Sequence, residues 1–151
     1  MRVLLDTNVL ARIAQPGHLH HATALTAVDR LRQRGDELFI VPQCLYELWV
    51  ICTRPVEQNG LGLPVPVVVE RHEQAKAVFP LFPDNDAIFP AWERLVRELE
   101  VKGKHAHDAR LIAAIETHRI DSLLTFNAAD FSRYPGLVLI DPLGVGSAST
   151  L

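Results

Sequence analysis

The sequence predicts a single α/β domain with three layers, in which helices cover both faces of a mostly parallel central sheet. Two observations lead to this fold class. The chain has 151 residues, of which 48% are hydrophobic and 22% are charged, and this fits one globular domain with a buried core. Short apolar runs alternate with longer segments of helical periodicity, as is typical of parallel strands joined by crossover helices.

Four short runs rich in Val, Ile, Leu and Phe are expected to form the strands. They are Val3 to Leu5, Leu38 to Val41, Leu123 to Phe126 and Leu137 to Ile140. Strands covered on both faces are apolar throughout instead of alternating, and these runs fit that pattern. In an open parallel sheet, ligands bind in the crevice beyond the carboxyl ends of the strands. Polar residues that directly follow a strand are therefore candidate site residues.

Apolar residues at helical spacing predict helices between these strands. The predicted helices run from Ala22 to about Gly35, from Pro42 to about Arg54, from Val67 to Val78, from Ile88 to Leu99 and from about His107 to His118. Residues 1–143 are expected to form the domain, and residues 144–151 are expected to form a flexible tail.

The composition argues against several classes of protein. A net charge of −3 is not that of a broadly basic DNA-binding protein, so any contact with nucleic acid is expected to be local. The two cysteines, Cys44 and Cys52, would lie about 12 Å apart along one helix, which is too far for a disulfide. Asp6 interrupts the apolar start too early for a signal peptide, and no apolar run approaches the length of a membrane span. We therefore expect a soluble cytoplasmic protein.

Asp6 directly follows the first predicted strand, which places it at the mouth of the expected crevice. Taken alone, this position is equally compatible with two roles. Aspartate is a favoured helix N-cap, worth about 1 kcal/mol, and it is also a common site carboxylate.

Glu47 interrupts an apolar stretch of its predicted helix, in which Cys44, Val50 and Ile51 surround it. Burying an unpaired carboxylate costs several kcal/mol, so Glu47 requires either a cation or a hydrogen-bonding network. A structural ion pair with an arginine is the alternative, and we favour a role in a site over it.

Asp108 is expected in the first turn of the last long helix, on the same face as Leu111 and Ile112. Its carboxylate would point inward and meet the positive end of the helix dipole. That position favours the ionised form and its use as a hard oxygen ligand. Helix capping explains Asp108 equally well when the residue is considered alone.

Three polar residues, Thr125, Asn127 and Asp130, lie at or after the end of the strand Leu123 to Phe126, at the same level of the sheet as Asp6. Each has a structural alternative. Asn127 is a natural turn or N-cap residue, Asp130 can complete a capping arrangement, and Thr125 can be a polar strand residue without a further role.

These separate signals converge on one edge of the sheet, where Asp6, Asp108 and either Asn127 or Asp130 meet Glu47 from a neighbouring helix. Two carboxylates about 4 Å apart repel each other by roughly 4 kcal/mol at an effective dielectric constant of 20. Such a cluster therefore requires a cation or a bound proton. A ligand set made only of oxygen atoms favours Mg²⁺, or Mn²⁺, over zinc.

Four motifs carry these residues: Leu5-Asp6-Thr7-Asn8-Val9-Leu10, Tyr46-Glu47-Leu48, His107-Asp108-Ala109-Arg110-Leu111 and Leu124-Thr125-Phe126-Asn127-Ala128-Ala129-Asp130-Phe131. In this order and spacing they resemble a PIN-domain ribonuclease, and more narrowly the VapC-type toxin of a bacterial toxin–antitoxin pair, over nearly the whole chain. The resemblance implies that Asp6, Glu47 and Asp108 bind the metal and that Asn8 and Thr125 support the site. Many relatives carry an aspartate where this chain has Asn127, so either Asp130 substitutes for it or the site works with fewer carboxylates.

The resemblance also implies an activity and partners. The expected activity is endoribonuclease cleavage of RNA, in which one or two Mg²⁺ ions activate a water for in-line attack on a phosphodiester. The expected partners are a small antitoxin, whose tail occupies the acidic groove, and a second copy of the chain. Five basic residues either contact the RNA backbone or are simply solvated surface: Arg54, Lys102, Lys104, Arg110 and Arg133.

Competing functions lack their own motifs. The histidine runs His18-Leu19-His20-His21 and His105-Ala106-His107 suggest a zinc hydrolase, but no Cys-x-x-Cys or His-Glu-x-x-His accompanies them. A Walker-type glycine loop and a nucleophile elbow are also missing, which argues against an NTPase and against Ser- or Cys-based catalysis. The remaining alternative is a non-catalytic PIN-fold module that binds a protein or RNA. Glu47 argues against it, because a scaffold does not need a carboxylate inside an apolar helix.

Overall fold

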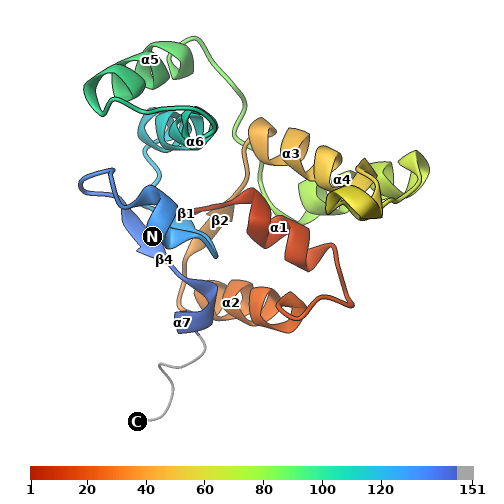
Figure 1. Cartoon of the computed structure of the whole chain (residues 1–151). Helices are drawn as coiled ribbons and strands as arrows, with labels where there is room; N and C mark the ends of the chain where they lie inside the picture. Colours follow the sequence, from red (N-terminus) through yellow and green to blue (C-terminus); the bar gives the residue numbers. More distant parts are fainter. Residues whose placement is uncertain (146–151) are drawn as a thin grey trace.

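A computed structural model of the chain, which describes residues 1–145, has a parallel sheet at its centre (Figure 1). Its strands are β1 (Arg2–Leu5), β2 (Glu37–Phe39), β3 (Ser122–Leu124) and β4 (Val138–Ile140). They lie in the order β2-β1-β3-β4, and every neighbouring pair is parallel. All four predicted strands and the predicted fold class are therefore confirmed.

Helices cover both faces of this sheet, which completes the three-layer α/β/α architecture. In Figure 1, α5 and α6 lie above the strands, α2 and α7 lie below them, and α3 and α4 lie to their right. The helices are α1 (Thr7–Ile13), α2 (His21–Gln33), α3 (Pro42–Thr53), α4 (Val65–Val78), α5 (Ile88–Glu98), α6 (His105–His118) and α7 (Pro142–Val145), with the short 3₁₀ helices η1 (Val56–Gln58) and η2 (Ala128–Phe131).

The structure contains helix α1 (Thr7–Ile13), which was not among the predicted helices, and the five predicted helices differ from the observed ones at their ends. Helix α6 begins at His105, two residues before the predicted start, and α2 ends before Gly35, whose φ of 91° is a left-handed conformation that favours glycine. The predicted flexible tail covered residues 144–151. Gly144 and Val145 form the end of α7, which packs against α2, and residues 146–151 lie outside the described part of the chain.

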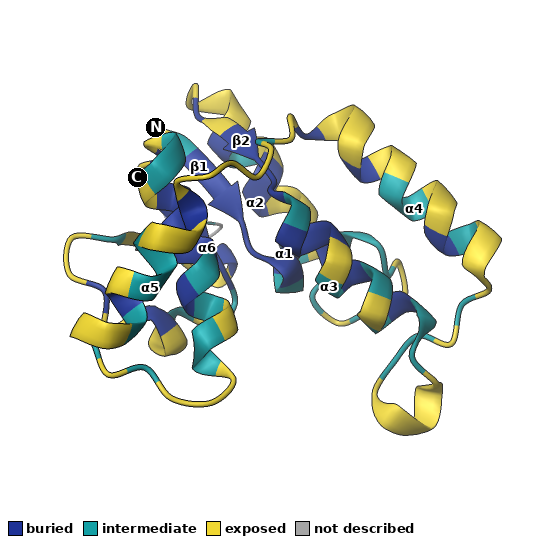
Figure 2. Ribbon diagram, turned by 90° about the horizontal axis from the view of Figure 1, so that it is seen from above, coloured by how far each residue is buried: buried dark blue, intermediate teal, exposed yellow. Residues whose placement is uncertain are grey.

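The core lies between the sheet and the inner faces of the helices, and burial in Figure 2 follows this arrangement. Helix α3 buries Leu45, Leu48 and Cys52. Helix α2 buries Ala24, Ala27, Val28 and Leu31, whereas Leu25 on the same helix is 40% exposed. Small side chains allow α2 to approach the sheet closely.

The sheet topology creates the crevice that ligands use in open α/β folds. The strands β1 and β3 are adjacent and central: the connection that leaves β1 leads to β2 on one side, and the connection that leaves β3 leads to β4 on the opposite side. The backbone N–H of Asp6 donates to the carbonyl of Leu124 at 3.0 Å, which joins the carboxyl ends of β1 and β3. Ligands bind at such a topological switch point.

Two further predictions concern covalent links and membranes. Cys44 and Cys52 are both buried and free, which confirms that they form no disulfide. Within residues 1–145, none of the helices combines the length and the apolar character that a membrane span requires.

Candidate active site

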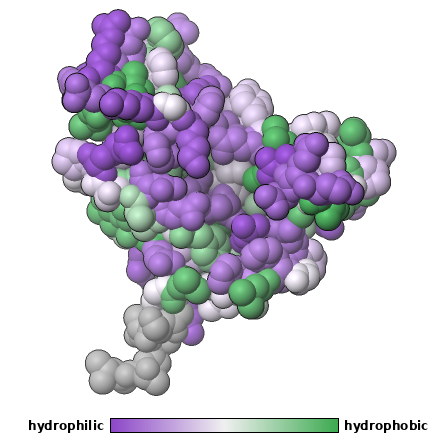
Figure 3. All heavy atoms as spheres, in the orientation of Figure 1, coloured by the Kyte–Doolittle hydropathy of each residue, from purple (hydrophilic) through white to green (hydrophobic). Residues whose placement is uncertain are grey.

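A polar cavity of about 280 Å³ opens at the carboxyl ends of β1 and β3. Six residues predicted for the site line it: Asp6, Asn8, Glu47, Asp108, Asn127 and Asp130. The seventh, Thr125, is fully buried and contacts Asp6 from behind. In the space-filling view, the middle of this face is recessed and mainly hydrophilic, between the part formed by α5 and α6 and the part formed by α3 and α4 (Figure 3).

Asp6 is both a helix cap and a member of the acidic cavity. It is the N-cap of α1, and its Oδ1 accepts a hydrogen bond from the backbone N–H of Thr7 at 2.7 Å. Burial raises the pKa of Asp6 to about 6, assisted by the negative charges of Glu47 and Asp108, while hydrogen bonds from Thr125 and Thr7 oppose the rise. The two roles that the sequence left open are therefore compatible, because Oδ1 caps the helix and the carboxylate still lines the cavity.

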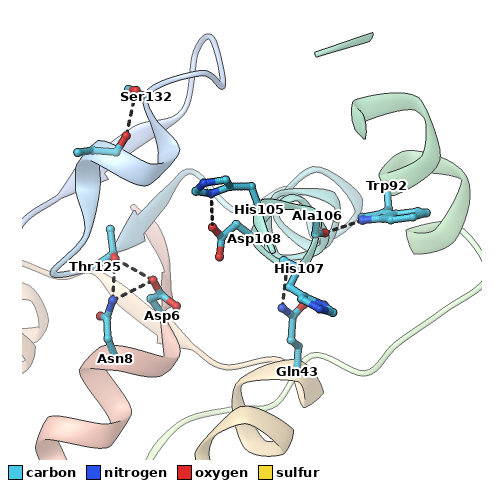
Figure 4. A network of polar contacts seen from close by, with 11 residues as sticks. Asp6, Asn8, Gln43, Trp92, His105, Ala106, His107, Asp108, Thr125 and Ser132 are labelled. Atoms are coloured by element: carbon cyan, nitrogen blue, oxygen red, sulfur yellow. Dashed lines mark hydrogen bonds and ion pairs between the residues drawn. The ribbon is translucent and has the colours of Figure 1, made fainter. Parts of the chain in front are cut away.

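Thr125 and Asn8 hold this carboxylate in place across the two central strands. The Thr125 hydroxyl donates to Asp6 Oδ2 at 2.8 Å, and the Asn8 amide donates to the same oxygen at 3.2 Å (Figure 4). Asn8 Oδ1 in turn accepts from the backbone N–H of Phe126 at 3.1 Å, and Thr125 Oγ1 accepts from that of Asn127 at 3.0 Å. These bonds fix Asp6 to the end of β3.

Glu47 is held by a hydrogen-bonding network, and no arginine forms an ion pair with it among the described residues. Thr7 Oγ1 donates to Glu47 Oε2 at 2.6 Å, and Gln43 Nε2 donates to Glu47 Oε1 at 2.8 Å. Gln43 also donates to the carbonyl of His107 at 2.8 Å and accepts from Arg110 at 3.3 Å. This buried glutamine therefore links Glu47 on α3 to the start of α6.

The sequence did not identify Gln43 or the Thr7 side chain as part of the site. Each carried a weak signal. Gln43 is a polar residue one turn before Glu47, and glutamine is an unusual choice for a buried position in an otherwise apolar helix. Thr7 is 4% exposed, yet its hydroxyl needs a partner once buried, and Glu47 provides it.

Asp108 lies in the first turn of α6 on the side that faces Asp6 and Thr125 (Figure 4). It does not cap the helix, because the N-cap position belongs to Lys104. Burial raises the pKa of Asp108, although His105, whose Nδ1 is 3.3 Å from Asp108 Oδ2, opposes the rise. The expectation that the helix dipole favours ionisation is thus outweighed by loss of solvent around the carboxyl group.

Asn127 and Asp130 occupy the exposed rim of the cavity. Asn127 is the N-cap residue of η2, as predicted, but its side chain forms no capping hydrogen bond. Asp130 follows within η2, and its negative charge contributes to the raised pKa of Asp108. Asn127 and Asp130, the two candidates for the last polar residue of the site, therefore both line the cavity. Among the described residues, the side chain of neither forms a capping hydrogen bond.

The donor atoms suit a hard divalent cation, but they are not drawn together around a single point. Within residues 1–145, no three His, Cys, Asp or Glu side chains lie close enough to hold one metal ion, and this includes the histidine runs. The carboxylates nevertheless share one cavity, and the negative charges of their neighbours contribute to the raised pKa values of Asp6 and Asp108, so a positive charge there would relieve their repulsion. Mg²⁺ fits this arrangement, because it keeps several waters and is typically bound by one or two carboxylates together with phosphate oxygens.

Several solved structures share this fold. VapBC2 from Rickettsia felis, bound to a DNA fragment from its promoter, aligns with a TM-score of 0.66 and 18% identity over 93% of this chain and 98% of that chain. VapBC-1 from nontypeable Haemophilus influenzae aligns with a TM-score of 0.68 and 16% identity over 95% and 99% of the two chains. VapC20 from Mycobacterium tuberculosis, a toxin that cleaves the sarcin-ricin loop, aligns with a TM-score of 0.54 and 21% identity over 80% and 86%.

Comparison of the sequence with known proteins and protein families identifies the family of this chain. No curated protein matches the chain significantly. The family model of the PIN domain, in contrast, matches residues 3–137, which include every residue that lines the acidic cavity. The structural neighbours are VapC-type toxins and their complexes, in agreement with that match. The chain therefore belongs to the PIN domain family.

Proposed function

We propose that the protein is a divalent-metal-dependent endoribonuclease, with Mg²⁺ as the metal and Mn²⁺ as a substitute. One observation supports this most strongly. Asp6, Glu47 and Asp108 come from three elements far apart in the sequence, yet they line one cavity, and the pKa values of Asp6 and Asp108 are raised. Raised pKa values of acids that face one cavity are typical of functional sites.

In this proposal, Asp6, Glu47 and Asp108 hold the metal, which when bound supplies an activated water and neutralises charge on the phosphate. Thr125 and Asn8 fix the direction of the Asp6 carboxylate, and Thr7 and Gln43 fix that of Glu47.

The rim residues complete the proposed site from the side of η2. We assign Asp130 as the fourth acid, placed to accept a proton, and Asn127 as a polar support beside it. Asp130 is exposed at the mouth of the cavity, in contrast to the buried Asp6.

For the biological role, we propose the toxin of a type II toxin–antitoxin pair that acts on RNA. Structures similar to this chain include VapBC complexes and a toxin that cleaves the sarcin-ricin loop. An antitoxin protein and a second copy of the chain are the partners that this role implies.

Cleavage of labelled RNA in the presence of Mg²⁺ tests the enzymatic part of the proposal. Asp6→Asn and Asp108→Asn should each lower the rate by about 100-fold or more, because each removes a metal-binding charge. Asp86→Asn is the matched control, since Asp86 is an exposed acid that does not line the cavity. Undiminished Mg²⁺-dependent cleavage by both site variants would refute the proposed mechanism.

Thermal unfolding with and without Mg²⁺ separates an enzyme from a non-catalytic PIN module. A site saturated at about 100 times its dissociation constant adds about 2.7 kcal/mol to the free energy of unfolding. The wild type should show this gain, and Asp6→Asn should show much less of it. A wild type that gains no stability from Mg²⁺ would favour a binding module.

A further inference from the structure

Two arginines line the acidic cavity in addition to the acids: Arg12 in the last turn of α1 and Arg54 directly after α3. Within residues 1–145, neither forms an ion pair with a carboxylate. Arg12 donates to the Gln15 side chain at 2.9 Å, and Arg54 donates to the carbonyl of Asn59 at 3.2 Å. We infer that Arg54, assisted by Arg12, binds a backbone phosphate of RNA next to the one that is cleaved. The inference rests on the proposed ribonuclease function and adds a substrate contact to it.

The first support is an unused hydrogen-bond donor. The Nε of Arg54 is buried and, among the described residues, has no hydrogen-bond partner. A buried donor without a partner costs about 1–3 kcal/mol. Four other buried side-chain atoms, in Arg71, His72, Ser122 and Tyr134, also have no partner among the described residues, and Arg54 differs from these residues because it lines the acidic cavity. A phosphate oxygen is the partner that a guanidinium group binds best, often through two parallel hydrogen bonds.

The second support is the loop that holds Arg54. Gly62 N–H donates to the Arg54 carbonyl at 2.9 Å, and a Cβ at Gly60 would lie only 1.9 Å from that carbonyl oxygen. Asn59, whose carbonyl accepts from the Arg54 guanidinium, has a φ of 62°, which is unfavourable for residues other than glycine and tolerated best by asparagine. The Asn59 carbonyl and the backbone bonds of this loop therefore hold the Arg54 guanidinium beside the cavity.

The position of the two arginines suits the phosphate next to the cleaved one. Arg54 lies seven residues beyond Glu47, and Arg12 lies six residues beyond Asp6, which correspond to about 10 Å and about 9 Å along the two helices. Since α1 and α3 pack against each other, both arginines lie at a similar distance from the acids. A strand whose cleaved phosphate faces the acids would therefore extend between these helices towards the arginines. A cation at a helix C-terminus is favourable in itself, and this effect is sufficient to explain Arg12. It does not explain why the Nε of Arg54 has no hydrogen-bond partner among the described residues.

Binding of a fluorescein-labelled single-stranded RNA, measured by anisotropy in an Asp108→Asn background to prevent cleavage, tests this inference. Arg54→Gln should weaken binding by about tenfold or more for RNAs of different sequence. It should also reduce the slope of log affinity against log salt by about 0.7, the value for one phosphate contact on a single strand. Arg97→Gln, which removes an equal charge from the 75% exposed Arg97 on α5, should change neither quantity.

Two further measurements separate the possible outcomes. Arg54→Lys should restore the salt slope but not the full affinity, since lysine keeps the charge and loses the planar fork. Melting temperatures of the variants show whether the loop is intact. If Arg54→Gln and Arg97→Gln bind RNA alike, the inference is overturned while the proposed function stands. If the Asp108→Asn chain binds no RNA at all, both fail.

Discussion

Replacing Asp6 by asparagine is expected to change how the stability of the fold depends on pH. Asp6 is 7% exposed, and burial, together with the charges of Glu47 and Asp108, raises its pKa from 3.8 to about 6. A tenfold change in proton affinity corresponds to about 1.4 kcal/mol, so ionised Asp6 lowers the free energy of unfolding at pH 7 by about 3 kcal/mol.

The direction of the effect follows from which state binds the proton more tightly. The folded chain holds the Asp6 proton more tightly than the unfolded chain does, so the stabilisation is complete below pH 3.8 and is lost as the pH rises through about 6. From about pH 4 to about pH 7, the wild type should therefore lose about 2 kcal/mol relative to Asp6→Asn, because part of the effect lies below pH 4. Asparagine also turns one oxygen that accepts hydrogen bonds into a donor, but this changes stability equally at every pH.

Urea denaturation followed by tryptophan fluorescence, repeated across this pH range with EDTA, measures the difference directly. Added Mg²⁺ should restore stability at pH 7 in the wild type only, because a cation in the cavity favours the ionised form of Asp6. Parallel stability curves for the two proteins between about pH 4 and pH 7 would show that Asp6 is not a destabilised buried acid. The electrostatic description of the cavity would then be wrong.

Three other substitutions test separate parts of the structure. Gly60→Ala should destabilise the fold by about 2 kcal/mol, since its Cβ would lie 1.9 Å from the Arg54 carbonyl oxygen; an unchanged melting temperature would contradict the loop geometry. Thr125→Val removes the hydrogen bond that lowers the pKa of Asp6, so the pH profile of RNA cleavage should move to higher pH, and an unmoved profile would exclude this influence. Asn127→Asp adds a carboxylate at the rim and should tighten Mg²⁺ binding in calorimetry; an unaltered affinity would indicate that this position does not contribute to the metal site.

The fold could be predicted because its signals are local. Strands buried on both faces are continuous apolar runs, and Gly35 and Pro42 mark helix boundaries that the structure reproduces. The burial of Ala24 and the exposure of Leu25 on α2 could not be predicted in this way, because both are acceptable core residues. Which of them faces the sheet depends on how closely the helix approaches it.

The acids could be predicted for a different reason, which is that each stands out from its surroundings. Asp6 follows a buried strand, and Glu47 interrupts an apolar helix. Gln43 and Arg54 stand out less, since the contacts of one depend on a carbonyl 64 residues away and the position of the other depends on the course of a loop. Their roles exist only once distant segments meet, so a single sequence contains little trace of them.

Residue 6 is an aspartate and not an asparagine, and this difference distinguishes a role as a helix cap from a role of the negative charge. Asparagine caps a helix about as well as aspartate does, and it would not carry the charge that costs about 3 kcal/mol in this buried position at pH 7. A chain that needed only a cap for α1 would therefore be more stable with asparagine. The aspartate is held by Thr125 and Asn8 with its charge directed into an acidic cavity, where only a proton or a cation relieves it. At neutral pH, most of the protons have left a group with a pKa of about 6, so the proposed binding of a cation would account for the carboxylate.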